Sequence, residues 1–272
     1  MIKQAIIPLA GLGTRLLPLS SVIPKELLPL HGKPNLEYIL EECVEAGIKE
    51  FIFVISDKKK NIKKYFFNDS FYKKIIIKKK NDKRLKYEFD KIKKYKKMIK
   101  FVFQNVPRGT GDAVLKCKKY IKSKYFLMLL PDDLILKKNC TKEMIKIHKR
   151  YKSSVIASKK VKKSEVSRWG IFKCKKINKN NIIINDVVEK PNYKIAPSNF
   201  AVIGRYILPS KIFHYLRNQK PGKNGEIHIT DSIRSLIMND EKFIGHIFAG
   251  KYLDCGTFDG YVNSSIKISK LL

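Results

Sequence analysis

Acidic residues are scarce in this sequence: its 272 residues include 24 Asp and Glu against 58 Lys and Arg, for a formal net charge of +34. Arginine is scarce too, because only eight of the basic residues are Arg and 50 are Lys. Proteins that read nucleic acids through bidentate contacts depend mainly on Arg. The excess of Lys, with frequent Ile and Asn, therefore favours mutational drift toward A and T in the coding DNA. We expect no specific nucleic-acid partner.

Cysteines and long apolar runs are also few. The five cysteines are odd in number and widely spaced, without a Cys-x-x-Cys unit, which argues against a disulfide scaffold or a cysteine metal site. No segment approaches the roughly 18 apolar residues needed to cross a bilayer. Glycines interrupt the first apolar segment too early for a signal peptide. We therefore expect a cytoplasmic protein without a membrane partner.

The pattern of apolar residues predicts an α/β fold. Short apolar runs alternate with amphipathic segments, which is typical of a parallel sheet covered by helices. We expect buried strands at 5–7, 51–55, 101–103, 126–130 and 155–157, and helices near 36–44 and 144–148. From about residue 168 we expect antiparallel strands at 171–174, 182–188 and 200–208, then a helix at 227–238. The predicted fold is a mostly parallel, Rossmann-like central sheet flanked by helices, with a smaller antiparallel part.

Residues 57–100 stand apart by charge, with 19 basic and five acidic residues and a net charge of +14. Aromatic residues such as Tyr65, Phe66 and Tyr87 interrupt the lysines, which favours amphipathic helices with a solvated face over a disordered tail. A nucleic-acid-binding groove would have a similar composition. We favour solvated helices, because the other 228 residues still carry a net charge of +20.

A glycine-containing loop follows the first predicted strand. Gly11 and Gly13 let the backbone approach a ligand closely and offer N–H groups to phosphate, and Arg15 adds a positive charge. It is not a dinucleotide-binding fingerprint, because Leu16 stands in the place of the third glycine. Prolines between residues 18 and 34 exclude a helix in the next segment. A stiff loop that carries Arg15, Lys25 and Lys33 is suited to gripping a polyphosphate.

Polar side chains follow two further strands. Gln104 comes after the strand at 101–103, and its amide can offer a donor and an acceptor together to the edge of a pyrimidine. Asp132 and Asp133 come after the strand at 126–130, at the end of the sheet where α/β folds bind ligands. Paired carboxylates there suit a hard cation whose remaining ligands are phosphate and water. Asp133 could equally be a helix cap.

The order of these motifs resembles that of the sugar-1-phosphate nucleotidylyltransferases. Their signature, G-x-G-T-R followed by P-K-x-x-x-P, occurs here at 11–15 and 24–29. The likeness is greatest to the members that make UDP-glucose and pyrophosphate from UTP and glucose 1-phosphate. It covers nearly the whole chain, with further matching motifs at 104, 109–114, 130–133, 188–191, 196–199, 204–206, 225–227 with 230–231, and 254–257.

The resemblance implies a role for each motif. The nucleotide would contact Ala10, Gly11, Gly13, Thr14, Glu26, Gln104 and Gly109, with the Gln104 side chain and the backbone of Ala10, Gly11 and Gly109 on the uracil. The sugar would contact Gly170 and Glu189, and Lys190 would hold its phosphate. The leaving pyrophosphate would contact Arg15 and Lys25, which with Lys190 are the expected catalytic cations. Mg²⁺ would be held by Asp132 and, by analogy with related thymidylyltransferases, Asp254.

The resemblance also implies one domain over 1–272. In it, 1–167 is the nucleotide-binding part, including the Lys-rich helical segment 57–100, and 168–272 is the sugar-binding part. A homodimer or homotetramer is the expected assembly. The chain departs from the family at two positions, with Trp169 where Tyr is usual and Ser21 where Lys is usual. The second change could weaken binding of UTP if that Lys assists pyrophosphate binding.

Two alternatives stay open. The enzyme could use dTTP or another sugar 1-phosphate, because the loop and the metal carboxylates are shared across the family. The Lys excess could instead mark a nucleic-acid-binding protein. No metal spacing is present among the histidines, which we expect to be structural or exposed: His31, His148, His214, His228 and His246.

Overall fold

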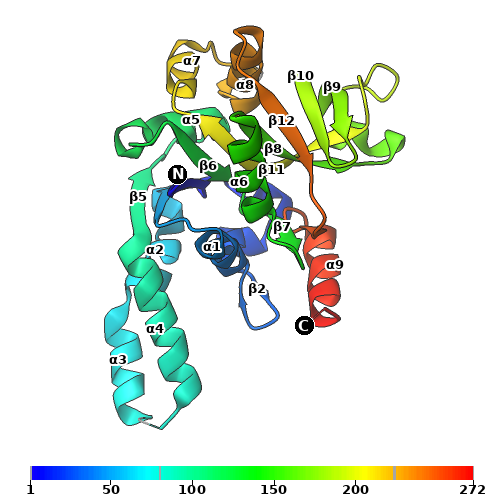
Figure 1. The fold of residues 1–272 in the computed structure, drawn as a ribbon. Coiled ribbons are helices and arrows are strands. Elements are labelled where there is room, and N and C mark those ends of the chain that lie inside the picture. Colours follow the sequence, from blue (N-terminus) through cyan, green and yellow to red (C-terminus); the bar gives the residue numbers. More distant parts are fainter. Residues whose placement is uncertain (1, 80, 223–224, 272) are drawn as a thin grey trace.

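The computed structural model describes residues 2–79, 81–222 and 225–271, and a mixed nine-stranded sheet runs through their centre (Figure 1). The strand order is β5-β4-β1-β6-β11-β8-β12-β10-β9. The strands are β1 (Gln4–Pro8), β4 (Glu50–Ile55), β5 (Ile99–Phe103), β6 (Tyr125–Leu129), β8 (Ser154–Lys160), β9 (Gly170–Asn178), β10 (Asn181–Glu189), β11 (Phe200–Pro209) and β12 (Phe243–Ile247).

The first four strands form the parallel half of this sheet. β4 pairs in parallel with β1 and β5, and β1 pairs in parallel with β6, as the apolar runs predicted. Successive side chains of a strand face opposite sides of the sheet. Phe51 and Phe53 accordingly belong to one core cluster and Ile52 to the other. The carboxyl ends of these four strands meet at one edge of the sheet. The predicted Gly-containing loop, Gln104 and Asp132 follow these strand ends.

Helices cover both faces of the sheet. One face packs against α1 (Asn35–Glu45) and α6 (Cys140–Tyr151), and the other packs against α5 (Gly109–Lys116), α7 (Ile212–Asn218) and α8 (Ile229–Met238). Buried apolar residues of these helices recur at helical spacing, as Leu36, Ile39, Leu40 and Cys43 do in α1. The helices predicted near 36–44, 144–148 and 227–238 are confirmed.

The antiparallel part continues the same sheet. β11 runs antiparallel to both β6 and β8, and β9 and β10 form an antiparallel hairpin at the sheet edge. The change of pattern predicted near residue 168 is therefore confirmed. β12, which joins β8 in parallel, was not predicted, because its five residues include Gly245 and His246 and give no long apolar run.

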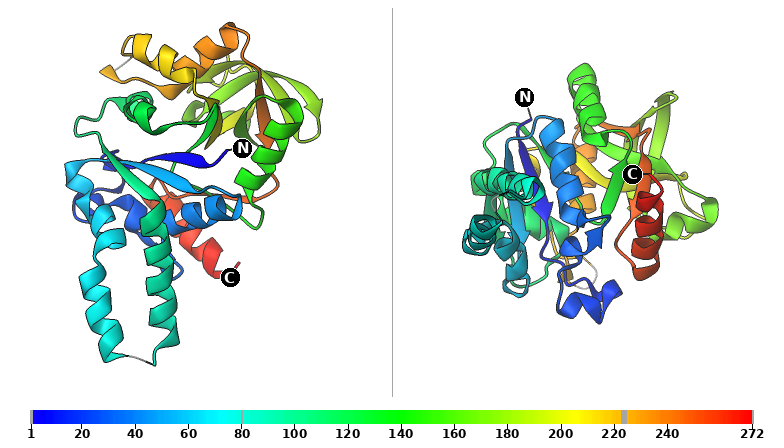
Figure 2. Two further views of the ribbon diagram at one scale, coloured as in Figure 1. Left: turned by 60° about the vertical axis from the view of Figure 1, so that its left-hand side comes forward. Right: turned by 90° about the horizontal axis from the view of Figure 1, so that it is seen from below.

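A helical hairpin extends from the body of the molecule (Figures 1 and 2). It consists of α2 (Lys60–Phe67), α3 (Asp69–Lys78) and α4 (Lys83–Met98). Phe66, Ile92 and Tyr95 are buried at its base, whereas the lysines farther out, such as Lys78 and Lys79, are exposed. The amphipathic helices predicted for 57–100 are thus confirmed. Lys80, part of the same run of lysines, lies outside the described residues.

Short elements complete the site edge. The segment between β1 and α1 contains 3₁₀ turns at Thr14–Leu16, Leu19–Ser21 and Lys25–Leu27, and the two-residue strands β2 (Pro29–Leu30) and β3 (Lys33–Pro34). β7 (Asp133–Leu136) pairs antiparallel with β13 (Lys251–Asp254), and α9 (Phe258–Ser269) follows. The pairing places Asp254 opposite Asp133. None of the helices in the described part of the chain combines the length and apolarity that crossing a membrane requires.

Candidate active site

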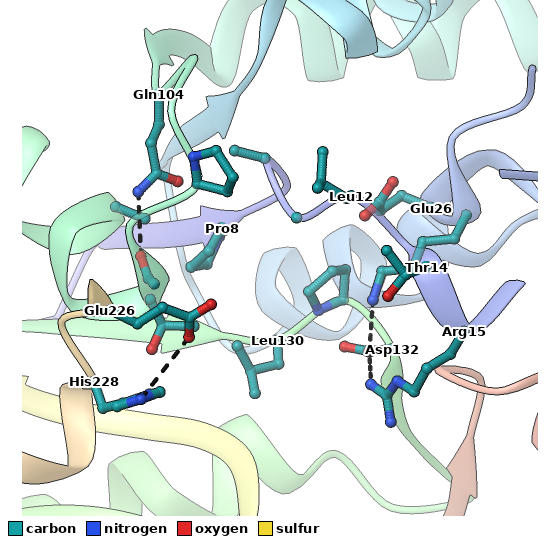
Figure 3. Close-up of a pocket in the computed structure, with 18 residues that line it drawn as sticks. Pro8, Leu12, Thr14, Arg15, Glu26, Gln104, Leu130, Asp132, Glu226 and His228 are labelled. Atoms are coloured by element: carbon teal, nitrogen blue, oxygen red, sulfur yellow. Dashed lines mark hydrogen bonds and ion pairs between the residues drawn. The ribbon is translucent and has the colours of Figure 1, made fainter. Parts of the chain in front are cut away.

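A cavity of about 490 Å³ opens at the carboxyl ends of the parallel strands (Figure 3). This volume is in the range of small-molecule sites. Nine residues predicted for the site line the cavity: Ala10, Gly11, Thr14, Arg15, Lys25, Glu26, Gln104, Gly109 and Asp132. Figure 3 shows Gln104 on one side and Arg15 with Asp132 on the other, so the amide and the charged groups lie at opposite ends of one cavity.

The loop after β1 is held in shape by its own contacts. Gly13 has a φ of +70°, in the left-handed region that favours glycine, and a side chain there would approach Ser20 Cβ to 3.2 Å. The hydroxyl of Ser20 donates to the carbonyl oxygen of Gly13 at 2.8 Å. Gly13 therefore shapes the turn that carries Thr14 and Arg15 into the cavity, although it does not itself line the wall.

Lys25 and Asp132 form the central ion pair of the cavity. Lys25 Nζ lies 2.7 Å from Asp132 Oδ2, and Arg15 Nη2 lies 3.7 Å from the same oxygen. Burial alone would raise the pKa of Asp132, but the Lys25 ammonium, a backbone hydrogen bond and the Arg15 charge together hold this pKa below its ordinary value. Burial likewise favours neutral Lys25, yet Asp132 and Glu26 raise its pKa. Both groups are therefore charged at neutral pH.

A second, deeper ion pair was not predicted. Lys59 Nζ donates to both carboxylate oxygens of Glu26, at 2.7 and 2.9 Å, and the two side chains are 8% and 1% exposed. Burial lowers the pKa of Lys59 below its ordinary value despite the attraction of Glu26. This pair holds the Glu26 side chain in place. Lys59 is one of three consecutive lysines, so the sequence carries no signal that distinguishes it.

Asp254 approaches Asp132 from a distant part of the chain. A β-carbon on Gly256 would lie 2.7 Å from Asp132 Oδ2, 3.2 Å from Arg15 Nη2 and 3.3 Å from Asp254 Oδ1, so both carboxylates and the Arg15 guanidinium border the space over this glycine. Two carboxylates over one gap fit Mg²⁺, whose other ligands are phosphate and water. No cluster of three or more His, Cys, Asp or Glu side chains suited to a metal occurs among residues 2–79, 81–222 and 225–271. The two acids thus fit a cation that phosphate helps to hold.

Asp133 has a different part in the structure. Its Oδ2 accepts from the backbone N–H of Gly204 at 2.8 Å, and its Oδ1 accepts from the hydroxyl of Tyr252 at 2.5 Å. Burial and the neighbouring charge of Asp132 raise the pKa of Asp133 to about 6. Asp133 therefore fixes β7 against β11 and β13, and it lies in a strand, not at a helix cap.

The predicted sugar residues lie together but outside this cavity. Gly170 pairs with Glu189 across β9 and β10, and a β-carbon at Gly170 would lie 3.1 Å from Glu189 Oε2. Lys190 Nζ is 3.9 Å from Glu189 Oε1, and the two side chains are 64% and 43% exposed. The Lys190 N–H donates to the carbonyl oxygen of Trp169. Trp169 and Asp254 both line a second cavity, of about 640 Å³.

Other residues depart from the sequence-based expectations. Glu226 and His228 line the main cavity, although no histidine was expected in the site. Their backbone segment is held against the beginning of α5, because Ile227 N–H donates to Arg108 O and Ile227 O accepts from Gly111 N–H, both at 2.8 Å. Lys33 does not line the main cavity, and its ammonium pairs with Glu41.

The strand order, the glycine-containing loop and the cations facing Asp132 are those of a nucleotide-binding α/β protein. A model of the nucleotidyl transferase family matches residues 4–70 and 63–270, and the chain belongs to this family.

Individual relatives are similar to this chain over nearly its whole length. A protein of Methanocaldococcus jannaschii is 38% identical over 98% of this chain and 93% of its own length. UTP–glucose-1-phosphate uridylyltransferase 2 of Staphylococcus saprophyticus is 36% identical over 98% of this chain and 91% of that protein. A solved UDP-glucose pyrophosphorylase in complex with UDP-glucose has a TM-score of 0.88 and 35% identity, and each chain is fully covered.

Proposed function

We propose that this protein transfers the uridylyl group of UTP to glucose 1-phosphate, releasing pyrophosphate and forming UDP-glucose. The observation that carries this proposal is the arrangement of one cavity, with Gln104 at one end and Arg15, Lys25 and Asp132 at the other. A base at the first end and phosphates at the second fit a nucleoside triphosphate. The relatives named for this activity support the choice of UTP and glucose 1-phosphate.

The reaction requires no protein nucleophile. A phosphate oxygen of glucose 1-phosphate attacks the α-phosphorus of UTP in line, and pyrophosphate leaves on the opposite side. Two anions must meet, so the protein acts mainly by neutralising charge and fixing orientation. Arg15, whose side chain is 64% exposed at the cavity mouth, and Lys25 are assigned to the leaving pyrophosphate.

The sugar phosphate is assigned to the second group of residues. Lys190 carries an exposed ammonium for the attacking phosphate, and Glu189 can accept from sugar hydroxyls. Gly170 leaves the space beside Glu189 free, because a side chain there would crowd the carboxylate. Asp132 and Asp254 would hold Mg²⁺, which when bound shields the charge of the phosphates.

The test is release of pyrophosphate from UTP by the purified protein with glucose 1-phosphate and Mg²⁺. We expect pyrophosphate release that requires UTP, glucose 1-phosphate and Mg²⁺ together. Release should be slower when dTTP replaces UTP or when another sugar 1-phosphate replaces glucose 1-phosphate. Absence of release with UTP and glucose 1-phosphate would overturn the proposal, and faster release with dTTP would assign the protein to thymidylyl transfer.

Sizing chromatography checks the predicted homodimer or homotetramer, and fractionation of cells checks the predicted cytoplasmic location.

A further inference from the structure

The side-chain amide of Gln104 is fixed by two acceptors of the protein. Its Nε2 donates to Asp112 Oδ2 at 2.7 Å and to the carbonyl oxygen of Gly109 at 3.2 Å. Gln104 and Asp112 are 4% and 9% exposed, so water competes little for these contacts. Figure 3 shows Gln104 at the end of the cavity opposite Arg15, with a dashed line at its amide nitrogen.

These contacts determine which way the amide faces. A glutamine amide has two N–H donors and one acceptor oxygen, whereas a carboxylate and a backbone carbonyl only accept. The reverse orientation would place Oε1 against two oxygen acceptors at the same distances, and it would leave Nε2 without them. Both donors of Gln104 are therefore used inside the protein. The cavity is left with the acceptor Oε1, not with the donor and acceptor together that the sequence led us to expect.

Asp112 is itself held firmly but does not line the cavity. It lies in the first turn of α5, where a carboxylate is favoured by the helix dipole. The neighbouring Gly111 donates its N–H to Ile227 O at 2.8 Å, and a β-carbon on Gly111 would meet that oxygen at 2.7 Å. The beginning of α5 is thus anchored to the segment that contains Ile227, and this anchoring fixes Asp112 relative to Gln104.

We propose that Asp112 is a positioning residue for base selection, because it makes Gln104 an acceptor-only contact. This inference rests on the proposed function, since it requires a pyrimidine at Gln104. The edge of uracil or thymine presents an N3–H donor between two carbonyl oxygens, and an acceptor-only Gln104 matches that N–H. Gly109 and Thr110, which begin α5 and line the cavity, have backbone N–H groups suited to a flanking carbonyl. Cytosine has an acceptor at N3 and is disfavoured.

The test measures binding of UTP and CTP by calorimetry without sugar phosphate, so that it does not depend on turnover. We expect the wild-type protein to bind UTP at least about tenfold more tightly than CTP, since an acceptor facing an acceptor loses a hydrogen bond. Equal binding of UTP and CTP would overturn the inference while leaving uridylyl transfer possible. No binding of UTP would overturn the proposed function itself.

The variant Asp112→Asn tests the positioning role. An amide at position 112 can donate as well as accept, so only the more distant Gly109 carbonyl oxygen, at 3.2 Å, still opposes the reversed Gln104 amide, which can then offer Nε2 to cytosine more readily. We expect the ratio of UTP affinity to CTP affinity to fall about fivefold, because the charge-assisted hydrogen bond from Gln104 to Asp112 is lost. An unchanged ratio in a folded variant would overturn the role of Asp112, and so would an equal loss of affinity for both nucleotides.

Two further variants separate positioning from general destabilisation. Asp231→Asn is the matched control, because Asp231 lies in the first turn of α8 and accepts from Gln219 Nε2 at 3.2 Å, away from the main cavity. It should leave the nucleotide ratio unchanged. Gln104→Met removes the amide, and adding Asp112→Asn to it should change the ratio no further. A further change in that double variant would show that Asp112 acts without Gln104 and would overturn the inference.

Discussion

Lys25 Nζ lies 2.7 Å from Asp132 Oδ2, so the acid assigned to Mg²⁺ already has a cation of the chain beside it. Both side chains are largely shielded from water, at 14% and 18% exposed, and their pKa shifts favour the charged forms. The pair keeps the Asp132 carboxylate ionised inside the main cavity. Because the same ammonium is assigned to the leaving pyrophosphate, we expect a change at Lys25 to affect both stability and turnover.

The first prediction concerns this pair. Asp132→Asn should abolish most pyrophosphate release, because it removes one of two carboxylates facing the gap over Gly256. It should also lower the free energy of unfolding by about 2 kcal/mol, because Lys25 is left without its closest partner. Denaturant unfolding and turnover measure the two effects. Turnover within a few fold of wild type would contradict the assignment of Asp132.

The second prediction concerns the sugar phosphate. Lys190→Ala should raise KM for glucose 1-phosphate and lower kcat, while the Kd of UTP measured alone should stay nearly constant. Lys194→Ala is a matched control, since Lys194 is also exposed and lies four residues along. A weaker affinity for UTP with no change toward glucose 1-phosphate would mean that Lys190 serves the nucleotide.

The third prediction concerns the buried pair of Lys59 and Glu26. Lys59→Met leaves the Glu26 carboxylate, which is 1% exposed, without the cation that contacts it and should cost about 3 kcal/mol of stability. Adding Glu26→Gln removes the unpaired charge and should restore part of that loss. Lys60→Met is the control, because Lys60 is 62% exposed and pairs only at the surface, with Asp57. Equal unfolding midpoints for Lys59→Met and Lys60→Met would refute this account.

Local sequence patterns predicted the strands and part of the site well. Buried parallel strands produce continuous apolar runs, as at 51–55, and the residues just after such runs are at the sheet edge that binds ligands. Gln104 and Asp132 were therefore predictable as lining the cavity. The family resemblance added Asp254, which no local pattern marks.

Residues that act through tertiary contacts were not predictable in this way. Lys59 differs from Lys58 and Lys60 only in facing Glu26, and that contact is made across the fold. Asp112 looks like an ordinary acidic residue in a first helical turn, and only the distance to Gln104 gives it a role. β7 and β13 have four residues each, too few for a periodic pattern. Their pairing, which brings Asp254 close to Asp132, depends on the whole fold.

The last prediction concerns the lysines of the helical hairpin. If drift explains them, replacing the exposed residues Lys73, Lys74, Lys78, Lys93, Lys94 and Lys97 with Gln should leave pyrophosphate release nearly unchanged. The hairpin extends away from the body (Figure 2), and exposed charges farther away than about 8 Å are largely screened at physiological salt. A nucleic-acid-binding function predicts tight DNA binding that this variant loses, with a shallower salt dependence. Filter binding of DNA across a salt series distinguishes the two explanations. If drift explains the lysines, the wild-type protein should have only weak, non-specific affinity for DNA.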